Sequence, residues 1–159
     1  MTPDTISLLL AHGFRYVSNG MANDYTPYRA RQGDVITMHE PSKFGPETPL
    51  IDIPVSWSLD DAPHFKVVRT PHGVQPGLSN ADAVLGNWAA DFDYMRATMD
   101  WGVLTYTFHP YRIGRGHRMM MLERLVDHLA CNGTCFMTMP NVADEFDRRS
   151  PFPRPELSC

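Results

Sequence analysis

The sequence is poor in the features that mark secreted, membrane-spanning and nucleic-acid-binding proteins. Its three cysteines do not form two pairs at the spacing of a zinc site. Its 14 Lys and Arg residues are outnumbered by 18 Asp and Glu residues and form no basic run, so we expect no nucleic-acid partner. No basic-then-apolar leader opens the chain, and no apolar stretch approaches the roughly 18 residues of a membrane span. We therefore expect no membrane partner and predict a location in the reducing cytoplasm.

Motifs that would identify several common enzyme classes are also missing. The sequence has no Gly-x-Ser-x-Gly nucleophile elbow, no phosphate-binding loop and no dinucleotide fingerprint. No two of its seven histidines stand four residues apart, so it has no self-contained metal pair. At 159 residues the chain is too short for a complete eight-fold β/α barrel, which typically takes about 250 residues.

The sequence does contain an alternation of helical and strand-like segments. Apolar residues at three- and four-residue steps predict two long amphipathic helices, and β-branched apolar runs predict strands. The order predicts an α/β fold with a largely parallel sheet and outer helices. The predicted helices cover residues 2–13, 79–102, 117–130 and 141–146, and the predicted strands cover residues 14–17, 34–38, 50–57, 103–108 and 134–139.

Two groups of polar residues directly follow predicted strands, where a parallel sheet gathers its ligand-binding loops. His109 comes after the strand at 103–108, and Asp60 and Asp61 come after the strand at 50–57. A histidine in this place suits proton transfer, and neighbouring carboxylates can orient it or act as acid–base groups. The alternative is a strand-end histidine and two acids that only serve a turn.

Three further residues stand beside these groups. Arg112 can orient an anionic or amide-rich ligand by paired hydrogen bonds, although it also fits a solvated basic surface. Trp57 and Phe65 can line a pocket, although aromatic side chains near strand ends more often belong to the core.

Three ordered stretches carry a resemblance to one family. They are GFRYVSNGMANDYTPY at 13–28, LIDIPVSWSLDDAPHF at 50–65 and TYTFHPYRIGRGHR at 105–118. These stretches resemble the substrate loop, the strand with its acidic loop and the late histidine motif of polysaccharide deacetylase-like hydrolases, in the branch with allantoinase-like and cyclic-imide-hydrolase-like members. The resemblance implies a distorted β/α barrel that hydrolyses carbon–nitrogen bonds other than peptide bonds. It implies His109 as general acid, Asp60 and Asp61 as its supporting loop, and Asp24 and Tyr28 as substrate-binding residues.

The chain also departs from this family. The family's early Asp-Asp motif, its His-x-x-x-His metal pair and its Arg-x-Pro segment are missing. The resemblance places them upstream of Met1, so we expect no cofactor to be encoded in this chain. Residues 1–147 are then the C-terminal portion of a partial (β/α) barrel that lacks its N-terminal part, and residues 148–159 a flexible tail. Because an incomplete barrel exposes strand edges, we expect a homo-oligomer or a complementing N-terminal half.

These observations leave more than one function open. The first hypothesis is a hydrolase with a small-molecule amide, imide or acetylated-sugar substrate, in which the isolated chain is poorly active. The alternative is a non-catalytic remnant or ligand-binding module that keeps the pocket without the chemistry. A third possibility is a small α/β binding protein unrelated to the family.

Overall fold

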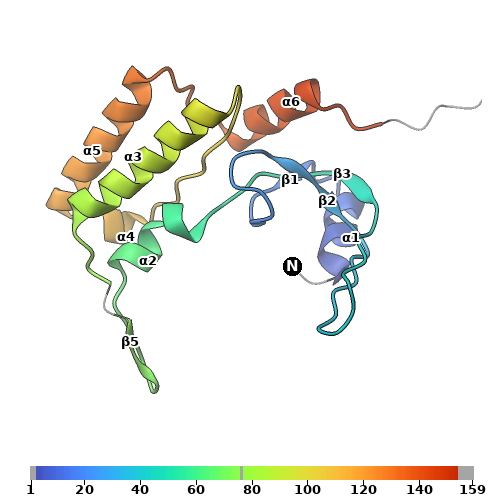
Figure 1. The fold of residues 1–159 in the computed structure, drawn as a ribbon, viewed down its shortest axis with the longest axis horizontal. Coiled ribbons are helices and arrows are strands. Elements are labelled where there is room, and N and C mark those ends of the chain that lie inside the picture. Colours follow the sequence, from blue (N-terminus) through green and yellow to red (C-terminus); the bar gives the residue numbers. More distant parts are fainter. Residues whose placement is uncertain (1–2, 76, 154–159) are drawn as a thin grey trace, which may run out of the picture. The chain divides into compact units, whose positions relative to one another are not determined.

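The computed structural model describes residues 3–75 and 77–153 (Figure 1). The chain divides into two compact units, and each is described by itself. The first unit consists of the residues up to Pro54 together with those from Met137 onward, and the second is Val55–Phe136. Within the described ranges, no helix is both long and apolar enough to cross a membrane.

A three-stranded sheet lies at the centre of the first unit. Its middle strand β3 (Glu47–Asp52) is parallel to β1 (Tyr16–Val17) and antiparallel to β2 (Tyr28–Arg31). The β-branched run that predicted a strand here supplies the fully buried side chains Leu50, Ile51 and Ile53. Two helices complete the unit, α1 (Pro3–Ala11) and α6 (Met139–Arg149).

Arg29 on β2 holds α6 and the segment that follows it. Its buried guanidinium pairs with Asp147 at 2.5 Å, donates to the Ser150 carbonyl at 2.8 Å and lies 5.4 Å from the Phe152 ring centre. Because α6 continues through Arg149, the tail predicted from residue 148 begins inside a helix. Residues 154–159 of that predicted tail lie outside the described residues.

Helices make up most of the second unit. The 3-10 helix η1 (Trp57–Leu59) leads into α2 (Asp61–Phe65), and a hairpin of β4 (Val68–Thr70) and β5 (Gly73–Gln75) follows. The long helices α3 (Ala81–Thr98) and α5 (Gly116–Cys131) pack side by side, and the short α4 (Pro110–Ile113) precedes α5 (Figure 1). Most of the apolar positions predicted from periodicity are buried here, with Trp88, Phe92, Met121, Leu125 and Leu129 in the core, whereas Val126, expected to face inward, is exposed.

Two helix starts differ from the prediction. The helix predicted from residue 79 begins at Ala81, and Asn80 caps it, because its side-chain oxygen accepts the backbone N–H groups of Asp82 and Ala83 at 2.8 and 3.2 Å. Pro140 lies in the first turn of α6 and does not end a strand. Proline suits that position, where its missing N–H removes no helical hydrogen bond. The last helix is therefore longer than the predicted 141–146.

The prediction of a largely parallel sheet is wrong for the described residues. One strand pairing is parallel, β1 with β3, whereas β2 with β3 and β4 with β5 are antiparallel. The described segments 103–108 and 134–139 form no strand, and the first makes one parallel bridge, between Thr107 and Asp60. Strand composition favours an extended backbone, but a ladder also needs a neighbouring strand that supplies donors and acceptors. The α/β class is confirmed, and the partial barrel stays a prediction.

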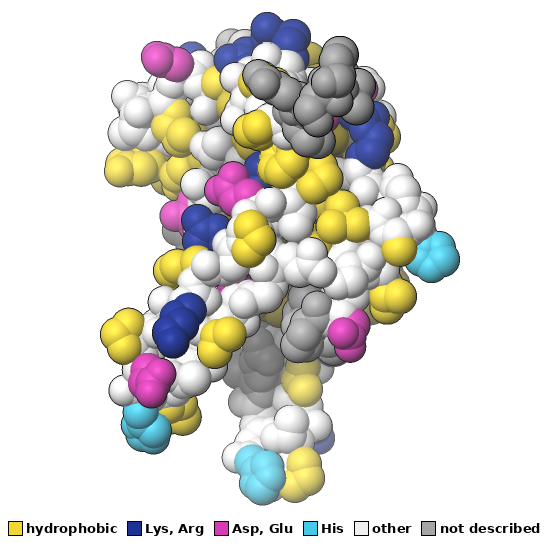
Figure 2. All heavy atoms as spheres, turned by 90° about the vertical axis from the view of Figure 1, so that its right-hand side faces the viewer, with side chains coloured by type: hydrophobic (Ala, Val, Ile, Leu, Met, Phe, Trp, Pro, Cys, Tyr) yellow, Lys and Arg dark blue, Asp and Glu magenta, His cyan; other side chains and the backbone are white. Residues whose placement is uncertain are grey.

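Apolar side chains are exposed at several points, as Figure 2 shows for one face, where they lie among charged side chains of both signs. In the loop between β2 and β3, Ile36 is 74% exposed and Met38 is 94% exposed. Such surface is compatible with the expected oligomer, which stays a prediction. Cys131 and Cys135 are free and exposed, and the cytoplasmic location also stays a prediction.

Candidate active site

The second unit brings together the two polar groups that follow the predicted strands. Asp60 caps α2, Asp61 is the first residue of that helix, and His109 is the residue before α4. The Asp61 N–H donates to the Thr107 carbonyl at 3.0 Å, and the Thr107 N–H donates to the Leu59 carbonyl at 2.9 Å. These bonds hold the two loops side by side, so the two polar groups lie together, although no parallel sheet forms an edge beneath them within the described residues.

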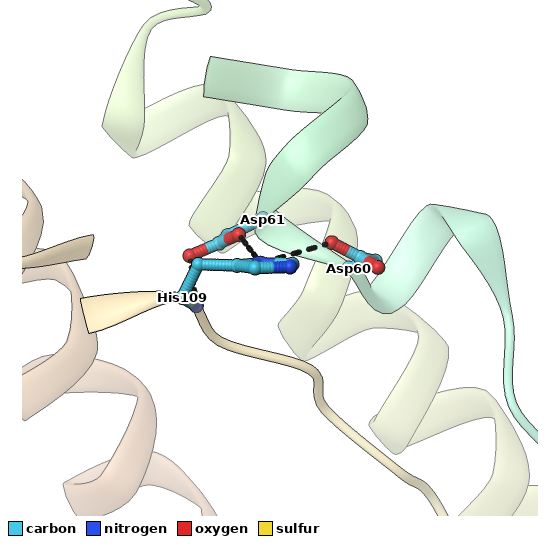
Figure 3. A group of neighbouring side chains, drawn as sticks. All are labelled: Asp60, Asp61 and His109. Carbon is cyan, nitrogen blue, oxygen red and sulfur yellow. Dashed lines mark hydrogen bonds and ion pairs between the residues drawn. The ribbon is translucent and has the colours of Figure 1, made fainter. Parts of the chain in front are cut away.

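Both oxygens of the Asp61 carboxylate contact His109 (Figure 3). Oδ1 lies 2.6 Å from His109 Nδ1, and Oδ2 accepts the backbone N–H of His109 at 2.7 Å. The Asp61 side chain is fully buried, whereas the imidazole is 33% exposed. The carboxylate therefore sets both the backbone position and the ring orientation of His109.

This contact determines which ring nitrogen can meet a substrate. An ionised carboxylate only accepts hydrogen bonds, so the geometry assigns a proton to His109 Nδ1. Nε2 is the ring nitrogen left for another partner. A histidine held in this way can transfer a proton at Nε2 while the carboxylate stabilises the imidazolium.

Asp60 faces the same ring nitrogen, Nδ1, as Asp61 (Figure 3). Its Oδ1 is 3.7 Å from His109 Nδ1 and accepts the N–H of Ala62 at 2.7 Å. The ligand atoms of Asp60, Asp61 and His109 lie within 4.8 Å of one another, a spacing compatible with a metal ion. The hydrogen bonds do not fit a metal, because a cation would have to replace the Nδ1 proton that Asp61 binds. The cluster fits a positioned proton donor.

Two buried arginines lie next to this cluster, Arg112 near Asp61 and Arg118 bonded to the Arg112 carbonyl. Arg112 is buried, its Nη1 lies 3.7 Å from Asp61 Oδ1, and its guanidinium lies 4.8 Å from the Tyr111 ring centre. Arg118 is also buried, donates to the Arg112 carbonyl at 2.8 Å and lies 4.4 Å from the Phe65 ring centre. The burial of Arg118 was not predicted, since an arginine at a helix start gives no sequence signal of burial.

The predicted aromatic residues have different surroundings. Trp57 is 65% exposed and open to a ligand, whereas Phe65 is buried beneath Arg118 and belongs to the core. Tyr111 was another missed residue. It is 75% exposed, and its ring meets the His109 imidazole edge-on at 5.9 Å. Its place two residues after His109 was the available signal.

Trp88 and His64 both contact the carbonyl of Ser58 and so hold the chain just before Asp60 in place. The Ser58 carbonyl accepts the indole N–H of Trp88 at 2.6 Å and lies 2.8 Å from His64 Nε2. Phe108 packs edge-on against Trp88 at 5.7 Å. The residues that precede Asp60 and His109 are thus attached to the same buried indole, which gives the site a rigid base.

The remaining predicted substrate-binding residues, Asp24 and Tyr28, belong to the first unit. Asp24 is exposed. Tyr28 donates its hydroxyl to the buried carboxylate of Asp52 at 3.2 Å, and the Gly20 N–H donates to the same carboxylate at 3.1 Å. Burial and the negative charge of Asp52 raise the pKa of Tyr28 to about 12. Tyr28 thus has a structural partner, and a contact of either residue with substrate stays a prediction.

The chain is similar in sequence and in fold to several known hydrolases. No protein-family model matches the chain. A peptidoglycan deacetylase of Helicobacter pylori is 32% identical over an alignment of 159 residues, which covers 92% of this chain and 54% of that protein. A candidate polysaccharide deacetylase structure from Mycobacterium smegmatis is 26% identical, with a TM-score of 0.72 over 99% of this chain and 51% of that one. PuuE allantoinase, at 18% identity, shares the fold with a TM-score of 0.68 over 96% of this chain and 45% of its own.

These findings confirm the resemblance inferred from the sequence. The chain is similar to polysaccharide deacetylases and aligns with part of their length. It spans about half the length of the relatives that it matches.

Proposed function

We propose that this chain is the part of a carbohydrate deacetylase that carries the general acid. The hydrogen-bonded pair of Asp61 and His109 is the observation that carries the proposal. The relatives named as peptidoglycan and polysaccharide deacetylases support an N-acetylated sugar as the substrate class. The reaction is hydrolysis of the acetamide to acetate and a free amine.

His109 would act when the carbon–nitrogen bond breaks. Water adds to the acetyl carbonyl, and the leaving nitrogen then needs a proton, because an amide anion is a poor leaving group. His109 donates that proton from Nε2, and Asp61 holds the ring through Nδ1. The group that activates the water, and the family metal with its ligands, are assigned to a complementing N-terminal half.

Two exposed aromatic residues lie close in sequence to members of the cluster, Trp57 three positions before Asp60 and Tyr111 two positions after His109. Trp57 and Tyr111 are both suited to contact the apolar face of a sugar ring. Tyr111 directly touches the His109 imidazole, so a sugar stacked on it would lie beside the proton donor. Ureides and cyclic imides are the alternative substrates of the same chemistry.

The proposal is tested by measuring acetate release from N-acetylglucosamine oligomers. The full chain is assayed alone and together with the complementing N-terminal half of a polysaccharide deacetylase, with allantoin and a cyclic imide as further substrates. We expect activity only in the mixture, and His109→Ala to lower it at least about 100-fold. His128→Ala is the matched control, because His128 pairs with Asp93 in an exposed contact between α3 and α5. Full activity of His109→Ala would contradict the proposal.

A ligand-binding module without catalysis is the second candidate. It is favoured by the absence of any His-x-x-x-His pair from the sequence. Calorimetric binding of the oligomers with no acetate release, whether or not the N-terminal half is present, would favour this candidate over the enzyme.

A further inference from the structure

The carboxylate of Asp61 is fully buried, and that burial makes its charge expensive to maintain. A buried carboxylate stays ionised only with a cation or several hydrogen-bond donors beside it. His109 supplies two donors, at its backbone N–H and at Nδ1. Under the proposed function, however, the imidazole loses its positive charge each time it donates a proton.

Arg112 lies where a permanent positive charge would be needed. Its side chain is only 10% exposed, and its Nη1 lies 3.7 Å from Asp61 Oδ1, the oxygen that also binds His109 Nδ1. The Nε and Nη1 atoms of Arg112 are buried and make no hydrogen bond within the described residues. At 3.7 Å the contact with Asp61 is an ion pair without a hydrogen bond, so its contribution is charge.

The place of this guanidinium is set by contacts on two sides. The Arg112 backbone N–H donates to the His109 carbonyl at 2.8 Å, and the Arg112 carbonyl accepts from Arg118. Its guanidinium also lies against the Tyr111 ring. Arg112 is therefore held near Asp61 by the same short helix, α4, that follows His109.

We propose that Arg112 is a positioning residue that keeps Asp61 ionised when His109 is neutral. Before proton transfer the cluster of Asp61, His109 and Arg112 carries charges of −1, +1 and +1, and after it −1, 0 and +1. The carboxylate thus keeps a cation in both states, and its bond to Nδ1 persists. This inference rests on the proposed function, and it replaces direct substrate binding as the main task of Arg112.

Removing the guanidinium should change the protonation of the neutral pair. In Arg112→Met, the Asp61 carboxylate has no cation once His109 is neutral. The His109 Nδ1 proton then passes to Asp61, and a proton from water binds at Nε2. The ring changes from the Nδ1–H to the Nε2–H form, and Asp61 becomes a neutral acid.

The test is ¹⁵N NMR of the His109 ring in the full chain, at a pH where the ring is neutral. We expect the Nδ1–H form in the wild type and in Arg112→Lys, and the Nε2–H form in Arg112→Met. An unchanged Nδ1–H form in Arg112→Met would overturn the proposal. This readout needs no catalysis, so it stands even if the chain hydrolyses nothing.

Kinetics of the complemented enzyme provide a second readout. Arg112→Met should lower kcat about 10-fold with little change in KM, and Arg112→Lys should restore most of it. In the Asp61→Asn background, adding Arg112→Met should change kcat by less than about twofold, because no carboxylate is left to compensate. The double variant also buries fewer charges, so it covers the case in which Arg112→Met fails to fold. A rise in KM alone, or an equal loss of kcat in both backgrounds, would refute the positioning role.

Discussion

Replacing Asp61 by asparagine tests the central contact of the site with almost no change in side-chain volume. The asparagine oxygen can still accept the His109 backbone N–H that Oδ2 accepts at 2.7 Å. The amide NH₂ then faces Nδ1, where the carboxylate oxygen lay at 2.6 Å. Since both groups carry hydrogen, the ring must give up its Nδ1 proton and become a hydrogen-bond acceptor there.

The loss of stability in Asp61→Asn follows from the two interactions that the substitution removes. The substitution removes one charge-assisted hydrogen bond, which contributes about 1.5–3 kcal/mol. It also leaves the buried Arg112 without its anion, and breaking a buried pair costs about 3–5 kcal/mol when nothing replaces it. Because asparagine also removes the cost of burying an ionised carboxylate, which offsets part of both losses, we expect the free energy of unfolding to fall by about 2–3 kcal/mol. The kcat of the complemented enzyme should fall about 100-fold, since the imidazolium is no longer stabilised.

Urea unfolding of the full chain measures the stability change. Asp82→Asn is the matched control, because Asp82 pairs with Arg124 at 2.5 Å while both side chains are more than half exposed. Exposed pairs contribute little, so the control should lose less than about 0.5 kcal/mol. Equal losses in the two variants would refute the argument from burial.

Two further predictions concern the first unit and its buried carboxylate. A Cβ on Gly20 would overlap Tyr28 Oη and Asp52 Oδ2, so Gly20→Ala should lower the unfolding free energy by about 2 kcal/mol in urea. Gly86→Ala in α3 is the control, because a Cβ there meets no neighbouring atom, and it should raise the unfolding free energy by up to about 1 kcal/mol. If Gly20→Ala lowers the unfolding free energy by no more than that amount, the predicted overlap with Tyr28 and Asp52 is contradicted. The pKa of Tyr28 is raised from 10.0 to about 12, so the unfolded chain loses this proton first and stability falls as the pH rises from 10 toward 12. Tyr28→Phe should flatten that fall in urea melts taken across this pH range, and an unchanged slope would show that another group causes it.

Local sequence signals predicted the long helices and pointed to three residues of the cluster, Asp60, Asp61 and His109. Periodic apolar positions predicted α3 and α5, because a helix that buries one face must repeat apolar residues every three to four positions. His109, Asp60 and Asp61 were found because each follows a segment of strand-like composition. These signals are short-range properties of the chain, so they survive in a single sequence.

Long-range pairing could not be predicted in the same way. The segment 103–108 has strand composition but makes only the bridge at Thr107, whereas β2, in a stretch expected to be loop, pairs with β3 over several residues. Whether an extended segment becomes a strand depends on which other segment lies beside it, and its own residues do not carry that information. The same reason explains why the sequence did not show that Arg118 is buried against the Phe65 ring.

The sequence by itself determined the α/β class, the amphipathic helices, the residue types of the cluster of Asp60, Asp61 and His109 and the resemblance to the deacetylase-like hydrolases. Only the tertiary structure decided that Asp61 binds both the backbone and the ring of His109, that Arg112 lies 3.7 Å from the same carboxylate, and that Tyr28 is bonded to Asp52. Composition and spacing record what each residue can do chemically. Which buried charge meets which donor depends on residues 24 to 51 positions apart in the chain, and folding alone brings them into contact.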